Sequence, residues 1–124
     1  MENISMSEND YVRHVLAAYC QTPTTAGRVH RQDRLLAVQL YRRGIPLSVI
    51  ENALVLGACR RLYRDPDAPP LPLVRSLSYF RGLIEEVLAL KVSPPDYFQY
   101  LRYKIQTFEE AKQRFLQAMQ SQNT

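Results

Sequence analysis

Arginine is the residue type that could carry chemistry in this sequence. Residues 13–81 contain eleven arginines and no lysine against four carboxylates, a net charge of +7, whereas the whole chain of 124 residues carries +4. The planar guanidinium offers a fork of donors that matches pairs of phosphate or carboxylate oxygens. This composition favours a polyanionic partner. The alternative is a solvated basic surface with scattered ion pairs, which requires no ligand.

Two groups of these arginines stand out by their spacing. In the first group, Arg60, Arg61 and Arg64 lie at the end of a predicted helix, with Tyr63 among them. Arg75 and Arg81 follow beyond a proline-rich connector. Several arginines around an aromatic ring can hold phosphates and stack a base. The alternative is that Arg60 and Arg61 only complement the negative end of the helix dipole.

The second group lies at the predicted start of another helix and consists of Arg28, His30, Arg31 and Arg34. Cations there oppose the positive end of the helix dipole, and this unfavourable placement favours a ligand. We therefore predict a surface that binds nucleic acid. Its expected residues are Arg28, Arg31, Arg34, Arg60, Arg61, Tyr63, Arg64 and Arg75.

The sequence contains no pattern typical of a catalytic, metal or cofactor site. Glu85 and Glu86 are adjacent, so a helix points them to different sides, unlike a pair of catalytic carboxylates. His14 and His30 lack the spacing of helical metal ligands, and only two cysteines are present. Glycine-rich phosphate loops and a GxSxG elbow are also missing. We expect a protein that is not an enzyme and uses no metal or cofactor.

The spacing of the cysteines and the length of the apolar runs indicate the cellular compartment of the protein. Cys20 and Cys59 lie inside predicted helices without a CxxC spacing, which is typical of small buried residues in a reducing compartment. The sequence leaves a disulfide between them open. No apolar run resembles a signal peptide or a membrane span. The expected location is the cytoplasm, with no membrane partner.

Hydrophobic residues recur with the helical period, and no stretch alternates as a half-buried strand does. We predict an all-α fold, with residues 1–124 forming a single domain that is one compact bundle of about five helices with a long C-terminal helix. The signals for the helix ends are Ser7, Gly44, Pro46, Ser93 and Pro94. The expected helices cover residues 7–20, 31–43, 46–63, 73 or 76 to 90, and 94–120, with residues 1–6 and 121–124 frayed. Residues 65–72 hold four prolines and should form a semi-rigid connector.

The apolar positions of these helices define the expected core. They are Tyr11, Val12, Val15, Leu16 and Tyr19, then Leu35, Leu36, Val38 and Leu40, and then Leu77, Phe80, Leu83 or Ile84, Val87 and Leu88. In the last helix, an apolar stripe has spacings of three, four and seven residues and consists of Leu101, Ile105, Phe108, Phe115 and Met119. A last helix of about 27 residues would be roughly 40 Å long, which exceeds the width expected of one small bundle. Helix 94–120 is therefore expected to bind a protein partner or to self-associate, unless its C-terminal half packs back after a kink.

The two helices over residues 31–43 and 46–63 have the spacing of a helix-turn-helix. Leu40, Gly44 and Ile50 fall at the positions of its packing residue, turn glycine and second-helix apolar residue. A recognition helix needs polar side chains that reach base edges, whereas residues 47–56 are mostly apolar. The composition favours a buried core helix instead.

Several short motifs are similar to those of a known family. They are Gly44–Ile45–Pro46 with Val49–Ile50–x–x–Ala53, then Leu77–Ser78–Tyr79–Phe80–x–x–Leu83–Ile84–x–x–Val87–Leu88, and then Thr107–Phe108–Glu109–Glu110–Ala111. Over residues 44–111 the chain resembles the helical C-terminal domain of DnaD-type primosomal proteins, although it has a proline-rich connector and no tryptophan. The resemblance implies DNA binding and a part in loading or remodelling replication complexes, without catalytic residues.

Two functions follow from these patterns. The first is a non-catalytic, cytoplasmic DNA-binding accessory protein of a replication or mobile-element system, which contacts phosphates through its arginines. The alternative is a protein–protein interaction module or adaptor with no nucleic-acid ligand, in which the last helix supplies the binding face. Glu2, Glu8 and Asp10 favour this alternative, because the acidic N-terminal segment could screen the basic surface.

Overall fold

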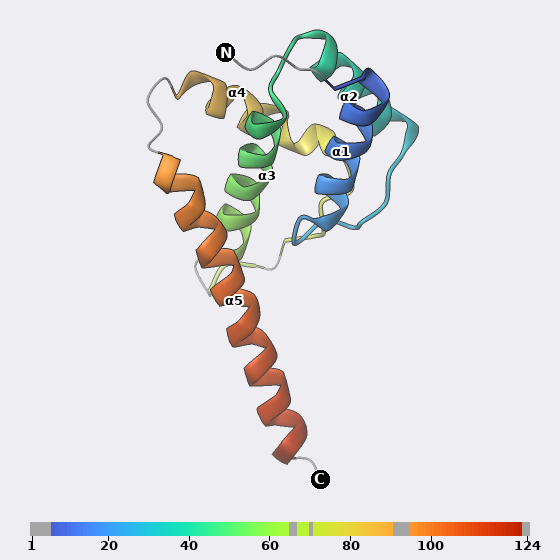
Figure 1. The fold of residues 1–124 in the computed structure, drawn as a ribbon. Helices are drawn as coiled ribbons and strands as arrows, with labels where there is room; N and C mark the ends of the chain where they lie inside the picture. Colours follow the sequence, from blue (N-terminus) through green and yellow to red (C-terminus); the bar gives the residue numbers. More distant parts are fainter. Residues whose placement is uncertain (1–5, 65–66, 70, 91–94, 123–124) are drawn as a thin grey trace.

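The structure, a computed structural model, describes residues 6–64, 67–69, 71–90 and 95–122 (Figure 1). Its elements are α1 (Glu8–Gln21), α2 (Arg31–Arg42), α3 (Leu47–Leu62), the 3₁₀ helix η1 (Leu77–Phe80), α4 (Arg81–Ala89) and α5 (Pro95–Gln122). Among the described residues no strand occurs, and Thr25 and Val74 form one isolated bridge. The predicted all-α fold, with five α-helices and a long C-terminal helix, is confirmed.

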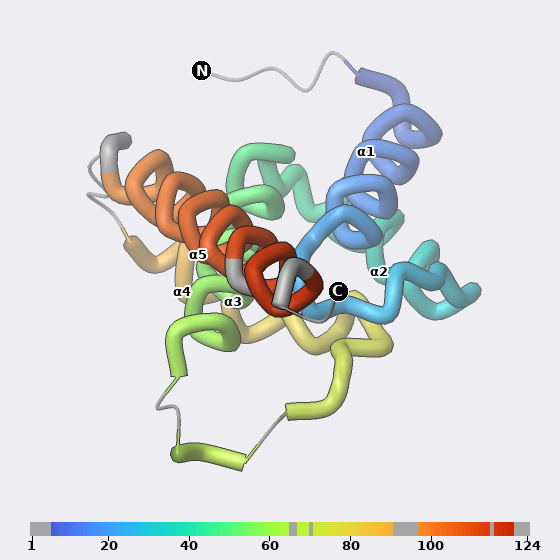
Figure 2. The backbone as a smooth tube through the Cα atoms, turned by 90° about the horizontal axis from the view of Figure 1, so that it is seen from below, coloured from blue at the N-terminus to red at the C-terminus, as the bar shows by residue number. Residues whose placement is uncertain are grey.

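Helix α3 lies at the centre of the bundle. It contacts α1, α4, α5 and η1. Viewed from below, α5 lies over α3, while α1 and α2 lie to one side and α4 to the other (Figure 2). Seven of its sixteen residues are buried, among them Ile50, Ala53 and Leu54. The interpretation of this segment as a buried core helix is therefore confirmed.

Local signals set most helix ends as predicted. The Ser7 side chain accepts a hydrogen bond from the backbone N–H of Asp10 at 3.2 Å, so Ser7 caps α1. Gly44 has a φ of +73° and closes α2, with its N–H donating to Tyr41 O and that of Ile45 donating to Leu40 O. This pair of bonds is a Schellman motif, which requires a left-handed residue where Gly44 stands.

Other boundaries differ from the prediction. The backbone of Pro46 is extended, with a ψ of 144°, so this residue precedes α3 as its cap instead of beginning the helix. The predicted fourth helix is divided into η1 and α4 after an extended segment. Helix α5 continues to Gln122, and the fraying expected of residues 121–124 stays a prediction. Connector residues 67–69 and 71–72 are not helical, as predicted, whereas residues 65, 66 and 70 and the expected start at Ser93 and Pro94 lie outside the described residues.

The core matches the predicted positions with two exceptions. Leu35 is 52% exposed and Leu88 is 39% exposed, so both were wrongly assigned to it. Leu35 lies about 100° around the helix from Leu36, and the side of α2 that packs on α1 and η1 carries Leu36 instead. In α4 the buried positions are Ile84 and Val87, and Leu88 follows them on the outer side.

Both cysteines are free thiols, with Cys59 buried and Cys20 half-buried. The thiol of Cys59 donates a hydrogen bond to the backbone oxygen of Leu101 at 3.3 Å, which joins α3 to α5. None of the described helices is long and apolar enough to cross a membrane.

The first half of α5 packs on the bundle and the second half extends away from it (Figure 1). Phe98 and Leu101 are buried, and Ile105 is partly buried against the core. Farther along α5, Phe108 meets the ring of Tyr63 at the end of α3, with 5.5 Å between the ring centroids. Met119 is 47% exposed, so the apolar stripe predicted along this helix continues past the bundle.

Candidate nucleic-acid interface

Two loops that are distant in the sequence lie side by side near the start of α2. Ala26 N donates to Val74 O at 2.8 Å, and Val74 N donates to Thr24 O at 2.9 Å. These bonds join the α1–α2 loop to the segment that leads into η1 (Figure 2). Arg28 follows Ala26 by two residues, and Arg75 follows Val74 directly. The bridge therefore brings the backbone segments that carry Arg28 and Arg75 close together.

The buried side chain of Asp33 connects the start of α2 to the start of η1 in the same region. Its side chain is only 2% exposed, and its carboxylate accepts hydrogen bonds from the backbone N–H of His30 at 2.8 Å and of Leu77 at 2.9 Å. The hydroxyl of Ser76 adds a longer bond of 3.4 Å. A buried carboxylate needs such donors, because burial removes its hydration. Asp33 thus ties the first turn of α2 to the start of η1.

Four of the predicted DNA-binding residues gather around this anchor. Arg28 and Arg75 lie on the two bridged segments, and Arg31 and Arg34 lie in the first turn of α2. All four side chains are exposed, and within the described residues none of them has a hydrogen-bond or ion-pair partner. We call these four residues the arginine face.

The charge around the arginine face is almost entirely positive. Segments 22–34 and 71–82 together contain five arginines and a single carboxylate, Asp33. Because Asp33 is buried and bonded to backbone N–H groups, it offers these arginines no exposed partner. The N-terminus of α2 adds its positive dipole end. The region therefore has a positive potential that favours anions.

The other predicted arginines make contacts within the chain. Arg60 donates two hydrogen bonds to Glu86, at 3.0 and 2.5 Å, and its guanidinium lowers the pKa of that carboxyl. Arg64 donates to the backbone oxygen of Pro69 at 2.7 Å. Glu85 pairs with Arg43 at 2.7 Å, so the adjacent glutamates have different partners, as their spacing predicts. Arg60 thus joins α3 to α4, and Arg64 joins the end of α3 to the connector that follows it.

Arg61 makes more intramolecular contacts than Arg60 or Arg64. It donates to Thr24 Oγ1 at 3.0 Å, to Tyr79 Oη at 3.3 Å and to the backbone oxygen of Pro72, and its guanidinium lies 5.4 Å from the centroid of the Tyr79 ring. Thr24 has a φ of +73°, which is rare for a β-branched residue. Arg61 thus connects the α1–α2 loop and the segment before η1 to the end of α3. It therefore acts as a positioning residue for the arginine face.

Tyr63, predicted to stack a base, packs on α5. Its hydroxyl donates to the backbone oxygen of Lys104 at 2.5 Å, and the Lys104 ammonium lies 4.6 Å from the centroid of its ring. The ring also contacts Phe108. The structure thus separates the predicted surface in two, because it gathers Arg28, Arg31, Arg34 and Arg75 and gives the residues from 60 to 64 intramolecular partners.

Sequence reasoning missed Asp33 and left Arg81, which it placed near the first group, out of the predicted binding residues. The pattern His30–x–x–Asp33 at the start of a helix is a signal of a capping residue that could have drawn attention to Asp33. Arg81 is exposed, and no described residue pairs with it. It lines a hollow of about 350 Å³ between α2 and η1, beside Gln32 and Gln39, and a second hollow of about 240 Å³ between α2 and α4, beside Glu85. Arg81 thus adds a cation next to the arginine face.

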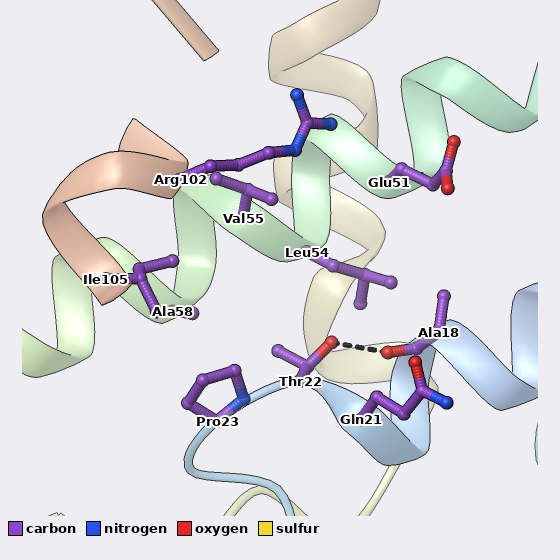
Figure 3. A pocket seen from close by; sticks show the side chains of 10 residues that line it. All are labelled: Ala18, Gln21, Thr22, Pro23, Glu51, Leu54, Val55, Ala58, Arg102 and Ile105. Carbon is purple, nitrogen blue, oxygen red and sulfur yellow. Dashed lines mark hydrogen bonds between the residues drawn. The ribbon is translucent and has the colours of Figure 1, made fainter. Parts of the chain in front are cut away.

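A second cavity, of about 260 Å³, lies between the end of α1, α3 and α5 (Figure 3). Its walls include Leu54, Val55 and Ile105, and its rim carries Glu51 and Arg102. Arg102 donates to the side-chain oxygen of Asn52 at 3.0 Å. The cavity is mainly an apolar gap where three helices meet.

A comparison of the chain with protein-family models, with curated proteins and with solved structures finds no match. The resemblance of residues 44–111 to the DnaD-type helical domain therefore stays a prediction.

Proposed function

We propose that this protein is a non-catalytic DNA-binding accessory protein that contacts phosphates through the arginine face. The observation that carries the proposal is the convergence of Arg28, Arg31, Arg34 and Arg75 at one place without an exposed carboxylate in the segments that hold them. Unpaired guanidinium groups gain most from phosphate oxygens, because they have no intramolecular bond to give up.

The expected recognition is of the phosphate backbone and not of sequence. Helix α3, which has the spacing of a recognition helix, packs in the core with seven of its sixteen residues buried, so few of its polar side chains are free to read base edges. Arginines on loops and in the first turn of α2 supply contacts to phosphates, which position a protein on DNA without reading its bases. We therefore expect binding with little sequence preference.

The resemblance to the DnaD-type domain supports a role in a replication or mobile-element system. The same resemblance favours DNA over RNA as the ligand. A cytoplasmic location agrees with DNA binding and with a role in replication. The neighbouring genes offer a direct check of this pathway, because a replication or integrase cluster is the expected context.

The binding proposal is tested by fluorescence anisotropy with labelled single- and double-stranded DNA across a range of salt concentrations. Four arginine–phosphate contacts on duplex DNA predict a slope of log affinity against log salt of roughly −3.6. Replacing all four residues of the arginine face by alanine should bring this slope close to zero. The matched control replaces Arg13, Arg42, Arg102 and Arg114, which removes the same charge from other parts of the surface.

Two outcomes would overturn the proposal. One is a folded wild-type protein that binds neither form of DNA at low ionic strength. The other is a control variant that loses as much affinity as the variant of the arginine face, because the effect would then come from net charge alone. The first outcome would leave the protein–protein interaction module as the function, an alternative that the exposed second half of α5 favours.

A further inference from the structure

The hollow between α2 and η1, of about 350 Å³, adjoins the arginine face. Three of its lining residues each come directly after an arginine of that face, and these pairs are Arg31–Gln32, Arg34–Leu35 and Arg75–Ser76. A ligand that is bound by these arginines therefore lies beside the hollow.

The lining of the hollow combines apolar surface, neutral polar groups and one cation. Leu35, which is 52% exposed, and Leu36 supply the apolar surface. The side chains of Gln32, Gln39 and Arg81 have no hydrogen-bond partner within the described part of the chain, so their donors and acceptors are free for a ligand. Among the described residues no carboxylate lines the hollow. This combination suits a flat ring with polar edges that belongs to a negatively charged ligand.

We infer that the hollow binds one unpaired base of a DNA single strand whose phosphates lie on the arginine face. The inference rests on the proposed function and names the form of DNA for which this surface is built. The volume of about 350 Å³ is near the lower end of the range of small-ligand pockets, about 300–1,000 Å³, and suits one base. The amides of Gln32 and Gln39 each donate and accept hydrogen bonds, so they can pair with the edges of different bases. Binding of a base here therefore agrees with little sequence preference.

The concave shape of this surface selects an unpaired base over a base pair. Proteins read base edges in duplex DNA with a helix or a ribbon that protrudes into a groove, whereas a hollow receives only a group that protrudes from the ligand. The bases of a duplex are stacked inside it, so a duplex offers this surface its phosphates alone. The bases of a single strand are free to turn outward and to contact apolar side chains and guanidinium groups. Leu35, which the core leaves uncovered, is then covered by the base, beside the guanidinium of Arg81.

The first test compares two labelled single strands of equal length by fluorescence anisotropy at low ionic strength. One strand carries all its bases, and the other consists of abasic nucleotides. Both present the same phosphates to the arginine face, but only the first can place a base in the hollow. The wild type should bind the strand with bases about tenfold more tightly. The slopes of log affinity against log salt should be equal for the two strands, because a contact with a base releases no counterion.

The second test locates the base with a triple variant that leaves the charge unchanged. Alanine replaces two amides and one exposed leucine of the hollow, in the substitutions Gln32→Ala, Leu35→Ala and Gln39→Ala. This variant should lose most of the preference for the strand with bases and keep the affinity of the wild type for the abasic strand. The matched control makes the same three changes on exposed positions of α5, as Gln113→Ala, Leu116→Ala and Gln117→Ala, and should keep the full preference.

The outcomes separate this inference from the proposed function. Equal binding of the two strands by the wild type, or an undiminished preference in the triple variant of the hollow, would overturn the inference and leave the phosphate contacts of the arginine face in place. A wild type that binds neither strand and no duplex would overturn the inference together with the proposed function.

Discussion

Replacing Asp33 by alanine should lower the free energy of unfolding by about 3–4 kcal/mol, although the residue lies in the first turn of a surface helix. The variant loses two short hydrogen bonds to a charged acceptor, each of which contributes about 1.5–3 kcal/mol. The N–H of Leu77 belongs to a fully buried residue and would lose its partner in a dry environment. The N–H of His30 belongs to an exposed residue and can bind water instead, so its contribution falls at the low end.

Asp33→Asn gives a graded version of the same test. The amide oxygen can accept one of the two bonds, but the amide NH₂ group cannot accept the other, and the charge is lost. We expect this variant to lose about half as much stability as the alanine variant. Asp10→Ala is the matched control, because Asp10 is an exposed carboxylate whose pair with Arg13 spans one turn of α1. Surface pairs of this kind contribute little, so the control should change stability far less.

Urea unfolding followed by circular dichroism measures all three variants. The slope of the transition should stay the same while its midpoint falls, since the folded state keeps its compactness. An alanine variant that lies within about 0.5 kcal/mol of the wild type, the usual range of surface substitutions, would show that Asp33 does not hold α2 and η1 together.

Three further expectations concern packing and pH. Gly57→Ala should lower the free energy of unfolding by about 1–2 kcal/mol, because a Cβ there would lie 2.7 Å from Cε1 of Phe80 and the cost of overpacking exceeds the gain in helix propensity. Gly82→Ala, which meets no atom within 4 Å, should not be destabilising in the same urea titration. Burial raises the pKa of Tyr11 from 10.0 to about 12, so the unfolded chain ionises first and stability should fall as pH rises through this interval. Tyr11→Phe should make that fall smaller without abolishing it, because burial also raises the pKa of Tyr19. Burial also raises the pKa of the Cys59 thiol, so this thiol should react with a thiol reagent at neutral pH only when denaturant unfolds the chain.

The sequence by itself determined the features that depend on contacts within a few residues. The cap at Ser7 acts on an N–H three residues away, and the turn at Gly44 depends on the left-handed conformation of a single residue. The apolar face of α1 follows from the helical period alone, because every side of a helix that packs on a core repeats at three and four residues. The number of helices, their order and the connector between α3 and η1 were predictable for this reason.

The tertiary structure alone decided which arginines are free. Arg60 meets Glu86 across 26 residues, Arg61 meets Thr24 across 37 residues, and Asp33 meets Leu77 across 44 residues. No spacing rule reaches so far, and an arginine that will be paired looks the same in the sequence as one that will not. The same limit explains the error at Leu35, since adjacent leucines fit the helical pattern equally well until α1 and η1 fix which side of α2 is covered. Composition could therefore predict a basic protein, but its arginine face exists only because the bridge at Val74 and the buried carboxylate of Asp33 bring two distant segments together.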